Sequence, residues 1–255
     1  MSIYGIISDV HGNLQALRAV LGELDRAGVD KVLCLGDLVG YNGDSDECVE
    51  LIRSRGIEAI AGNHDLIALG QLGFDRCSAK PSFALRRTRK QLDERSRRFL
   101  AQLPATRTYE ATVALIHGGV DDVCEYLVSP QQIAANAARL RERLPDVRLC
   151  FFGHTHTPKL FEVQGERVMA RTPAAPIELE ARDRLYFINP GSVDAARRPI
   201  KLAEYLVFDS ARWMVSFCRV GYDHETSERL ARAKGLRMGR ADVVLHRVRR
   251  WLSVT

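Results

Sequence analysis

The sequence lacks the features of membrane-spanning, secreted and fibrous proteins. None of its apolar runs approaches the roughly 18 residues that a membrane-spanning helix needs, and the start, MSIYGIISDVHG, has neither the basic segment nor the small-residue cleavage site of a secretory signal. Internal repeats and low-complexity tracts are absent, while 46% hydrophobic and 27% charged residues are typical of a folded globular chain. We therefore expect a water-soluble cytoplasmic protein of 255 residues with no membrane partner.

The six cysteines include no Cys-x-x-Cys pair, and several lie inside apolar runs, such as Cys34 in VLCLG and Cys150 in RLCFFG. This distribution favours small core residues in a reducing compartment over a disulfide framework.

The basic surplus lies mainly at the carboxyl end of the chain. Lysine and arginine exceed aspartate and glutamate by 37 − 32 = +5, and residues 229–255 alone contain eight basic residues and one acidic residue. This composition suggests nucleic-acid binding as one hypothesis, through the arginines Arg237, Arg240, Arg247, Arg249 and Arg250. We do not favour this hypothesis, because no base-reading motif accompanies the charge and such clusters are usually solvated or packing faces.

The first third of the chain predicts parallel β-α-β units. Apolar runs at residues 3–7, 31–35 and 57–61 each end in a polar loop. The first two are followed by helical patterns, one beginning after a plausible N-cap at Asn13 and the other opening at Ser45. Such units predict a sheet with helices on both faces, with ligands bound beyond the carboxyl ends of its strands.

The rest of the chain predicts further strands and a second sheet. Strands are expected at residues 113–116 and 147–152, with a helix at 130–143 between them and one long polar helix at 81–103 whose Arg-rich face is solvated. After Pro158, short β-type runs predict hairpins, with an irregular exposed connection at 172–184. We interpret residues 1–255 as a single domain. It ends in a basic helical extension at about 224–255, with apolar positions that include Val243, Val244, Val248 and Leu252.

Chemically active side chains gather in the loops that follow the predicted strands. Five of the seven histidines lie in such loops, beside Gly, Asp or Asn. Asp9 alone could simply cap a helix. The Gly-His-Thr-His run at 153–156 is more specific, since two imidazoles separated by one residue after a buried strand can converge on one cation. The full set of candidate metal ligands is Asp9, His11, Asp37, Asn63, His117, His154 and His156.

The donor types in this set indicate a metal centre. Two carboxylates, one carboxamide and four imidazoles suit borderline divalent ions such as Mn, Fe, Zn, Ni or Co better than Ca. Seven ligands are too many for one open catalytic ion. Shared between two ions through one bridging carboxylate, they form the kind of two-metal clamp, with ions about 3.5–4 Å apart, that catalyses displacement at phosphorus.

In their order along the chain, these motifs resemble those of the calcineurin-like metallophosphoesterases. The resemblance rests on Asp9-Val10-His11, Gly36-Asp37-Leu38-Val39-Gly40, Gly62-Asn63-His64-Asp65, His117-Gly118-Gly119 and Gly153-His154-Thr155-His156. The Asn189-Pro190-Gly191-Ser192 turn and the run at 204–209 resemble the bacterial single-domain branch. The resemblance implies an α/β/β/α sandwich of four layers, in which two mixed sheets are flanked by helices and the dimetal site lies at the carboxyl ends of the strands.

The resemblance also implies roles for individual residues. Asp9, His11, Asp37 and His156 would hold one metal, and Asp37, Asn63, His117 and His154 the other, with Asp37 as the bridge. A metal-bound hydroxide would attack a phosphate ester, and His64 would be the catalytic residue that donates a proton or hydrogen bond to the leaving oxygen. Manganese is among the expected ions, and the substrate would be a phosphodiester or a small phosphate ester.

Two departures from the family pattern bear on the substrate. Where the protein Ser/Thr phosphatase branch continues its Gly-Asp motif with an acidic residue and an arginine, this chain has Gly40 and Tyr41. The loop at 193–199 also differs from the Gly-Gln-Pro-Arg-like stretch of close relatives. The alternatives are a protein Ser/Thr phosphatase, a dinucleoside polyphosphate hydrolase and a metal-binding scaffold without turnover. The sequence leaves the oligomeric state open.

Overall fold

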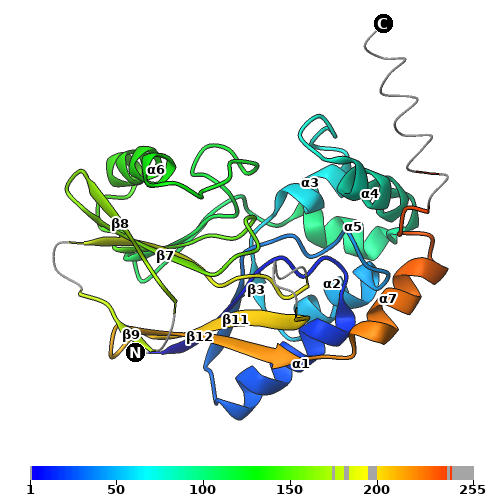
Figure 1. The fold of residues 1–255 in the computed structure, drawn as a ribbon, viewed down its shortest axis with the longest axis horizontal. Helices are drawn as coiled ribbons and strands as arrows, with labels where there is room; N and C mark the ends of the chain where they lie inside the picture. Colours follow the sequence, from blue (N-terminus) through cyan, green and yellow to red (C-terminus); the bar gives the residue numbers. More distant parts are fainter. Residues whose placement is uncertain (1, 174–175, 181–183, 195–199, 240–241, 243–255) are drawn as a thin grey trace, which may run out of the picture.

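Two six-stranded mixed sheets pack against each other in the computed structural model, which describes residues 2–173, 176–180, 184–194, 200–239 and 242 (Figure 1). The first sheet has the strand order β3 (Glu58–Ala59), β2 (Lys31–Cys34), β1 (Ile3–Ile7), β11 (Leu202–Asp209), β12 (Met214–Gly221) and β9 (Ile177–Glu178). The second has the order β4 (Arg107–Tyr109), β5 (Val113–Leu115), β6 (Leu149–Phe151), β10 (Leu185–Asn189), β7 (Lys159–Gln164) and β8 (Arg167–Arg171). Strands β1, β2 and β3 are parallel to one another, as are β5, β6 and β10.

Consecutive residues on the central strands serve different cores, because side chains alternate between the two faces of a strand. Ile6 and Leu33 belong to the core between the two sheets. Their neighbours Ile7 and Cys34 pack toward the helices of the first sheet. On the second sheet, Phe151 faces the core between the sheets, whereas residues 150 and 152 belong to the core under α6. These three cores confirm the four-layer sandwich.

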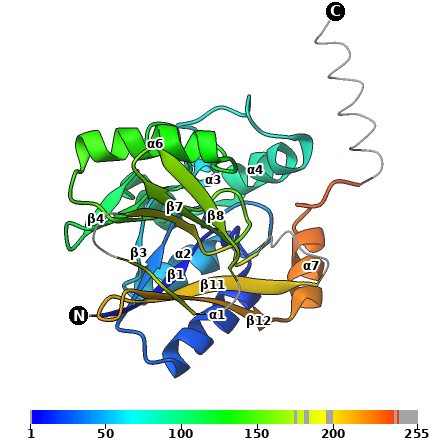
Figure 2. The same cartoon turned by 60° about the vertical axis from the view of Figure 1, so that its left-hand side comes forward.

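Helices cover the outer faces of both sheets (Figure 2). The described helices are α1 (Leu14–Arg26), α2 (Ser45–Ser54), α3 (Asn63–Leu69), α4 (Ala79–Gln91), α5 (Glu94–Ala101), α6 (Pro130–Arg143) and α7 (His224–Ala233). The expectation of helices on both faces of one sheet is wrong, because the inner face of each sheet packs on the other sheet. The cap at Asn13 is confirmed, since its side chain accepts a hydrogen bond from the N–H of Ala16.

The long polar helix expected at 81–103 is two helices. Leu92 has an extended ψ of 130° and ends α4, and Asp93 caps α5 by accepting a hydrogen bond from the N–H of Ser96 at 2.6 Å. Helix α3 and strands β4 and β9 were not predicted from the sequence. Strand β9 lies inside the connection that was expected to be irregular, and it pairs with β12.

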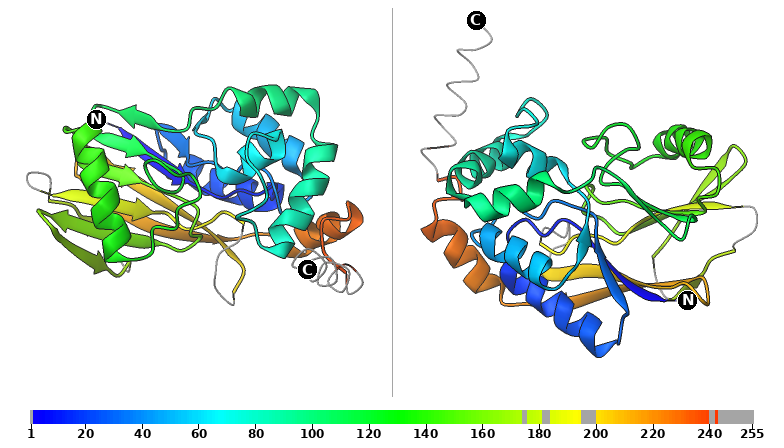
Figure 3. Two further views of the ribbon diagram at one scale, coloured as in Figure 1. Left: turned by 90° about the horizontal axis from the view of Figure 1, so that it is seen from above. Right: turned by 180° about the vertical axis from the view of Figure 1, so that it is seen from behind.

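The carboxyl-terminal part of the described chain folds back beside the first sheet. Helix α7 begins at the expected residue, His224, and contacts α1 (Figure 3). The further helical positions Val243, Val244, Val248 and Leu252 and the arginines 240, 247, 249 and 250 lie outside the described residues. All six cysteines are free thiols, and four of them are buried. Among the described residues, none of the helices has the length and hydropathy needed to cross a bilayer.

Candidate metal centre

The predicted ligand residues meet where the two sheets adjoin, at the carboxyl ends of five parallel strands. Loops after β1 and β2 carry Asp9, His11 and Asp37, Asn63 is the first residue of α3 shortly after β3, and loops after β5 and β6 carry the other three histidines. Backbone hydrogen bonds hold neighbouring loops together: the N–H of Asp9 donates to the carbonyl of Gly36 at 3.0 Å, and that of Gly153 donates to the carbonyl of His117 at 2.8 Å. Side chains far apart in sequence are thereby brought into one cluster.

One half of the cluster contains Asp9, His11, Asp37 and His156, each with a potential ligand atom within 4.8 Å of the others. The Nε2 atom of His156 lies 3.1 Å from Asp9 Oδ1 and 3.1 Å from His11 Nε2. The Nε2 atom of His11 lies 3.8 Å from Oδ2 of Asp37. All four residues are buried.

The other half is built around the same aspartate. Asp37, His117 and His154 form a second buried group of potential ligands. The Nε2 atom of His117 lies 3.4 Å from Oδ2 of Asp37 and 3.0 Å from Oδ1 of Asn63. Asp37 therefore belongs to both groups.

The imidazole nitrogens and side-chain oxygens of this cluster have lone pairs that could bind cations. The Nδ1 atom of His117 lies 2.7 Å from the carbonyl oxygen of Leu35, which fixes the ring and assigns Nδ1 as the donor. Its Nε2 atom then points its lone pair at the oxygens of Asp37 and Asn63. The Nε2 lone pair and these two oxygens repel each other unless a proton or a metal ion lies between them. Oδ1 of Asp9 and Oδ2 of Asp37 are buried without a hydrogen bond, so both remain available to a cation.

The pKa values of the histidines respond to the same charges. Burial acts to lower the pKa of His117, but the nearby Asp37 carboxylate outweighs burial and raises that pKa to about 9. Burial and the neighbouring His117 lower the pKa of His154 to about 4. For Asp37, burial acts to raise the pKa, but His117 and His64 outweigh it, and the pKa lies well below its usual range. Asp37 thus favours a positive charge on His117 beside it, whereas His154 stays neutral and keeps a lone pair.

His154 is oriented differently from His117. Its Nε2 atom lies 3.2 Å from the carbonyl oxygen of Cys124, in position to donate a hydrogen bond. That bond leaves Nδ1 as the atom with a free lone pair. The backbone N–H of His154 donates to Oδ2 of Asp9 at 3.2 Å, which links the last ligand loop to the first.

Several candidate ligands have strained backbones. The φ angles of Asp9, His11, Asp37, His154 and His156 lie between 51° and 63°. These five make up most of the eight described non-glycine residues with positive φ. Because such conformations cost of order 1–3 kcal/mol each and cluster at functional sites, the strain supports a functional role for these loops.

Glycine is required where the loops approach each other most closely. A Cβ atom on Gly62 would lie 2.1 Å from Asp37 Oδ1, and a Cβ atom on Gly40 would lie 2.6 Å from His64 Nδ1. Any larger side chain at these two positions would displace groups of the cluster.

His64 lies beside the first ligand group without belonging to it. Its ring centroid is 4.5 Å from that of His11 and 5.0 Å from that of Tyr41, and its Nδ1 atom is buried without a hydrogen bond. The backbone N–H of His64 donates a hydrogen bond to Oδ1 of Asp37 at 2.8 Å. The ring centroid of Tyr126 lies 4.1 Å from that of His154. Each half of the cluster thus has a tyrosine ring beside one of its histidines.

Several residues that build this site have no role predicted from the sequence. Asp65 accepts hydrogen bonds from the N–H groups of Asp37, Leu38, Val39 and Gly62. Its place after Asn63 and His64 in one short motif is a signal that could have identified it. Ser192 donates to the carbonyl of Asp9 at 3.1 Å, which explains the Asn-Pro-Gly-Ser turn as a support for the first ligand loop. For Tyr126 the sequence offers no comparable signal.

Comparisons with known proteins agree with this geometry. The family model described as the calcineurin-like phosphoesterase superfamily domain matches residues 1–212. An uncharacterized protein of Methanocaldococcus jannaschii is 33% identical over 231 residues, which are 87% of this chain and 88% of that protein. The chain belongs to the calcineurin-like phosphoesterase superfamily.

Solved structures show the same architecture. A metallophosphoesterase from Sphaerobacter thermophilus superposes with a TM-score of 0.76 at 30% identity, over 95% of this chain and 97% of that chain. A hypothetical protein from Pyrococcus horikoshii superposes with a TM-score of 0.69 at 17% identity, over 96% of this chain and 97% of that chain, and shows the shared fold alone. The class expected from the sequence motifs is therefore confirmed.

Proposed function

We propose that this protein is a metal-dependent phosphoesterase that hydrolyses phosphodiesters or small phosphate esters at a two-metal centre. The observation that carries the proposal is the buried cluster in which two groups of carboxylates and imidazoles share Asp37. Family membership supports the same class of reaction.

The residues suit two divalent transition ions. Asp9, His11, Asp37 and His156 would hold one ion, and Asp37, Asn63, His117 and His154 the other. When bound, two such dications polarise phosphate oxygens and make water acidic enough to act as a nucleophile near neutral pH. Mn, Fe, Zn, Ni and Co all fit this mixture of nitrogen and oxygen donors, and manganese is our first choice for reconstitution.

The chain's own residues would orient the substrate and manage its leaving group. His64 lies beside the first ligand group without being a member of it. We assign it the role of donating a hydrogen bond or proton to the departing oxygen. Tyr41 and Tyr126 would bound the space in which the ester lies.

Small esters suit this site better than phosphoproteins. The arginine that would grip a phosphate in the protein Ser/Thr phosphatases is replaced by Tyr41 at the corresponding position. Without that fixed bidentate contact, recognition of the phosphoryl group falls more heavily on the metals. Dinucleoside polyphosphates remain an alternative substrate class.

The test combines metal analysis with turnover. Protein reconstituted with Mn²⁺ is expected to hydrolyse bis(p-nitrophenyl) phosphate and to lose this activity in a chelator. Asp37→Asn is expected to reduce both bound metal and turnover at least a hundredfold. Asp25→Asn is the matched control, because Asp25 is exposed on α1 and pairs with Arg55 away from the cluster.

Two outcomes would contradict the proposal. Turnover by Asp37→Asn at the unmodified rate would refute the shared carboxylate. A fully metal-loaded protein that hydrolyses none of a panel of monoesters, diesters, cyclic nucleotides and dinucleoside polyphosphates would favour the metal-binding scaffold instead.

A further inference from the structure

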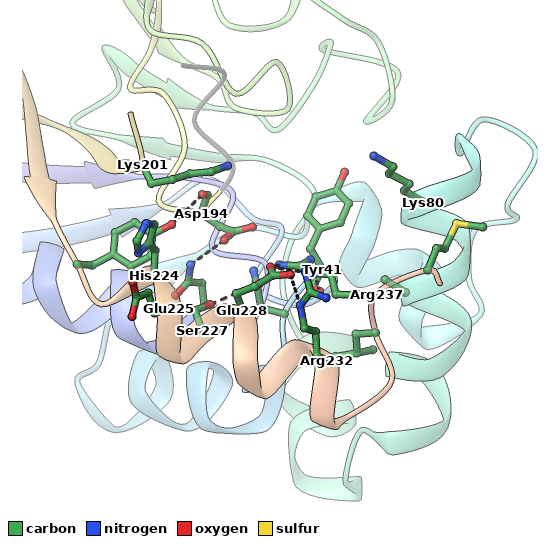
Figure 4. Close-up of a pocket in the computed structure, with 16 residues that line it drawn as sticks. Tyr41, Lys80, Asp194, Lys201, His224, Glu225, Ser227, Glu228, Arg232 and Arg237 are labelled. Carbon is green, nitrogen blue, oxygen red and sulfur yellow. Dashed lines mark hydrogen bonds and ion pairs between the residues drawn. The ribbon is translucent and has the colours of Figure 1, made fainter. Parts of the chain in front are cut away.

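A cavity of about 860 Å³ opens beside the metal-ligand cluster (Figure 4). Tyr41 and Asp194 connect the two spaces. The Tyr41 ring lines the cavity and lies 4.4 Å, between centroids, from that of His11. The N–H of Asp194 donates to the carbonyl of Asp9 at 3.1 Å, and its side chain lines the cavity. An ester bound at the cluster could therefore extend directly into this space.

The far wall of the cavity is formed by α7 and the residues that follow it. This wall lies beyond residues 1–212, the part of the chain that matches the family model. Arg237 holds it in place: its guanidinium group donates to the carbonyl of Tyr41 at 3.1 Å and to Oδ1 of Asn42 at 2.9 Å, and it pairs with Glu228 at 2.7 Å. Asn42 is itself buried and donates to the carbonyl of His11 at 3.2 Å. The far wall of the cavity is thus attached by hydrogen bonds to the loop that contains Tyr41 and Asn42.

The charged side chains that line the cavity differ in whether another residue already pairs with them. The carboxylate of Glu228 is engaged by two arginines, and that of Asp194 accepts a hydrogen bond from Asn13 at 2.7 Å. Lys80 and Lys201, in contrast, have no ion-pair or hydrogen-bond partner within the described part of the chain. They extend toward each other from opposite sides of the cavity, and the Tyr41 hydroxyl lies between them in this view (Figure 4). Two ammonium groups without a partner in the described part of the chain thus border the cavity.

We propose that this cavity is a subsite for a second anionic group of the substrate, such as a further phosphate on the arm that remains beyond the scissile bond. Lys80 and Lys201 would supply the charge, and Tyr41 would separate this subsite from the cluster. The inference rests on the proposed function for the reaction at the cluster, but binding at the subsite does not require the metals. The substrate class is then a phosphodiester with a second phosphate on one arm.

The activity test uses two esters that differ only in the second phosphate. These are the p-nitrophenyl ester of thymidine 5′-phosphate and the same ester with an added 3′-phosphate. We expect the wild-type enzyme to favour the phosphorylated ester in kcat/KM by at least tenfold. The double variant Lys80→Ala/Lys201→Ala is expected to lose this preference and to hydrolyse the simpler ester as the wild type does. Lys31→Ala is the control, because Lys31 begins β2 and faces Glu58.

A binding measurement separates this inference from the proposed function. Calorimetry with metal-free protein and inorganic pyrophosphate is expected to show binding that the double lysine variant weakens at least tenfold and that the exposed control Asp25→Asn leaves unchanged. If the proposed function alone fails, neither ester is hydrolysed but pyrophosphate still binds in this manner. Equal kcat/KM for the two esters, or pyrophosphate binding that is indifferent to both lysines, would overturn the subsite.

Discussion

The carboxylate of Asp65 accepts a hydrogen bond from the backbone N–H of Asp37 at 2.8 Å. It accepts further backbone hydrogen bonds, so one buried side chain fixes the loop from which the shared metal-ligand candidate extends. Burial and the charge of Asp37 raise the pKa of Asp65 to about 7, although hydrogen bonds from Gly62 and Val39 oppose this shift.

Asp65→Asn should therefore destabilise the fold and weaken metal binding together. An amide has one acceptor oxygen, and its NH₂ group would face backbone donors, which leaves buried groups unsatisfied at a cost of about 3 kcal/mol. Urea unfolding of the metal-free protein measures the first effect and metal titration the second. The exposed Asp25→Asn should change the unfolding free energy by less than about 1 kcal/mol. Equal losses in both variants would show that the Asp65 contacts contribute little.

Gly62→Ala should lower stability by about 2–3 kcal/mol, because the new methyl group would lie within 2.3 Å of the Asp37 backbone nitrogen. The backbone φ of Gly62 is −96°, so the cost comes from crowding and not from the backbone conformation. The matched change Gly22→Ala lies within α1, where the nearest neighbouring atom is 3.8 Å away. It should stabilise the protein by about 0.5–1 kcal/mol. Thermal unfolding of both variants provides the comparison, and equal melting temperatures would refute the crowding argument.

His64→Gln should lower kcat by about 10²–10⁴ while the bound metal content stays unchanged. The loss should be largest for alkyl phosphodiesters, whose leaving oxygen needs a proton, and smallest for p-nitrophenyl esters, whose leaving group departs as a stable anion. Rates across a series of leaving groups measure this difference. A uniform loss across the series would instead assign His64 to positioning or metal binding.

Removal of metal should lower the melting temperature. An ion that binds only the folded state contributes about 2.7 kcal/mol at a free concentration one hundred times its Kd, so two filled sites could add about 5 kcal/mol. For a chain of this size that corresponds to a shift of roughly ten degrees or more. Calorimetry with Mn²⁺ and with a chelator tests this prediction. Identical melting temperatures would mean that the buried cluster holds no tightly bound ions.

The cluster could be predicted from the sequence because of one geometric rule: parallel strands place their carboxyl ends at one edge. Asp9, Asp37 and His154 each follow a short apolar run that is long enough to identify as a strand. Local pattern did not resolve the break at Leu92, because its buried side chain continues the apolar spacing of a helix and only the backbone angle ends it.

Contacts that depend on distant segments were beyond prediction. Nothing near Arg237 in the sequence indicates that it bonds the backbone of Tyr41, since that contact requires the chain around α7 to fold back onto the first part of the protein. Tyr126 likewise reaches the cluster only because the chain folds next to His154. The identities of the candidate ligands can be predicted from the local sequence, whereas the shape of the space around them depends on the tertiary structure.

The candidate ligands come from both sheets of the sandwich: Asp37 extends from the first and His117 from the second. Bound ions would therefore add cross-links between two layers that are otherwise joined at this seam by apolar packing and by hydrogen bonds, such as that of His154 with Asp9. Separation of the layers would break both coordination sets at once, so metal occupancy should slow amide hydrogen exchange in β5 and β6 as much as in β1 and β2. The reaction centre would then also stabilise the contact between the two sheets.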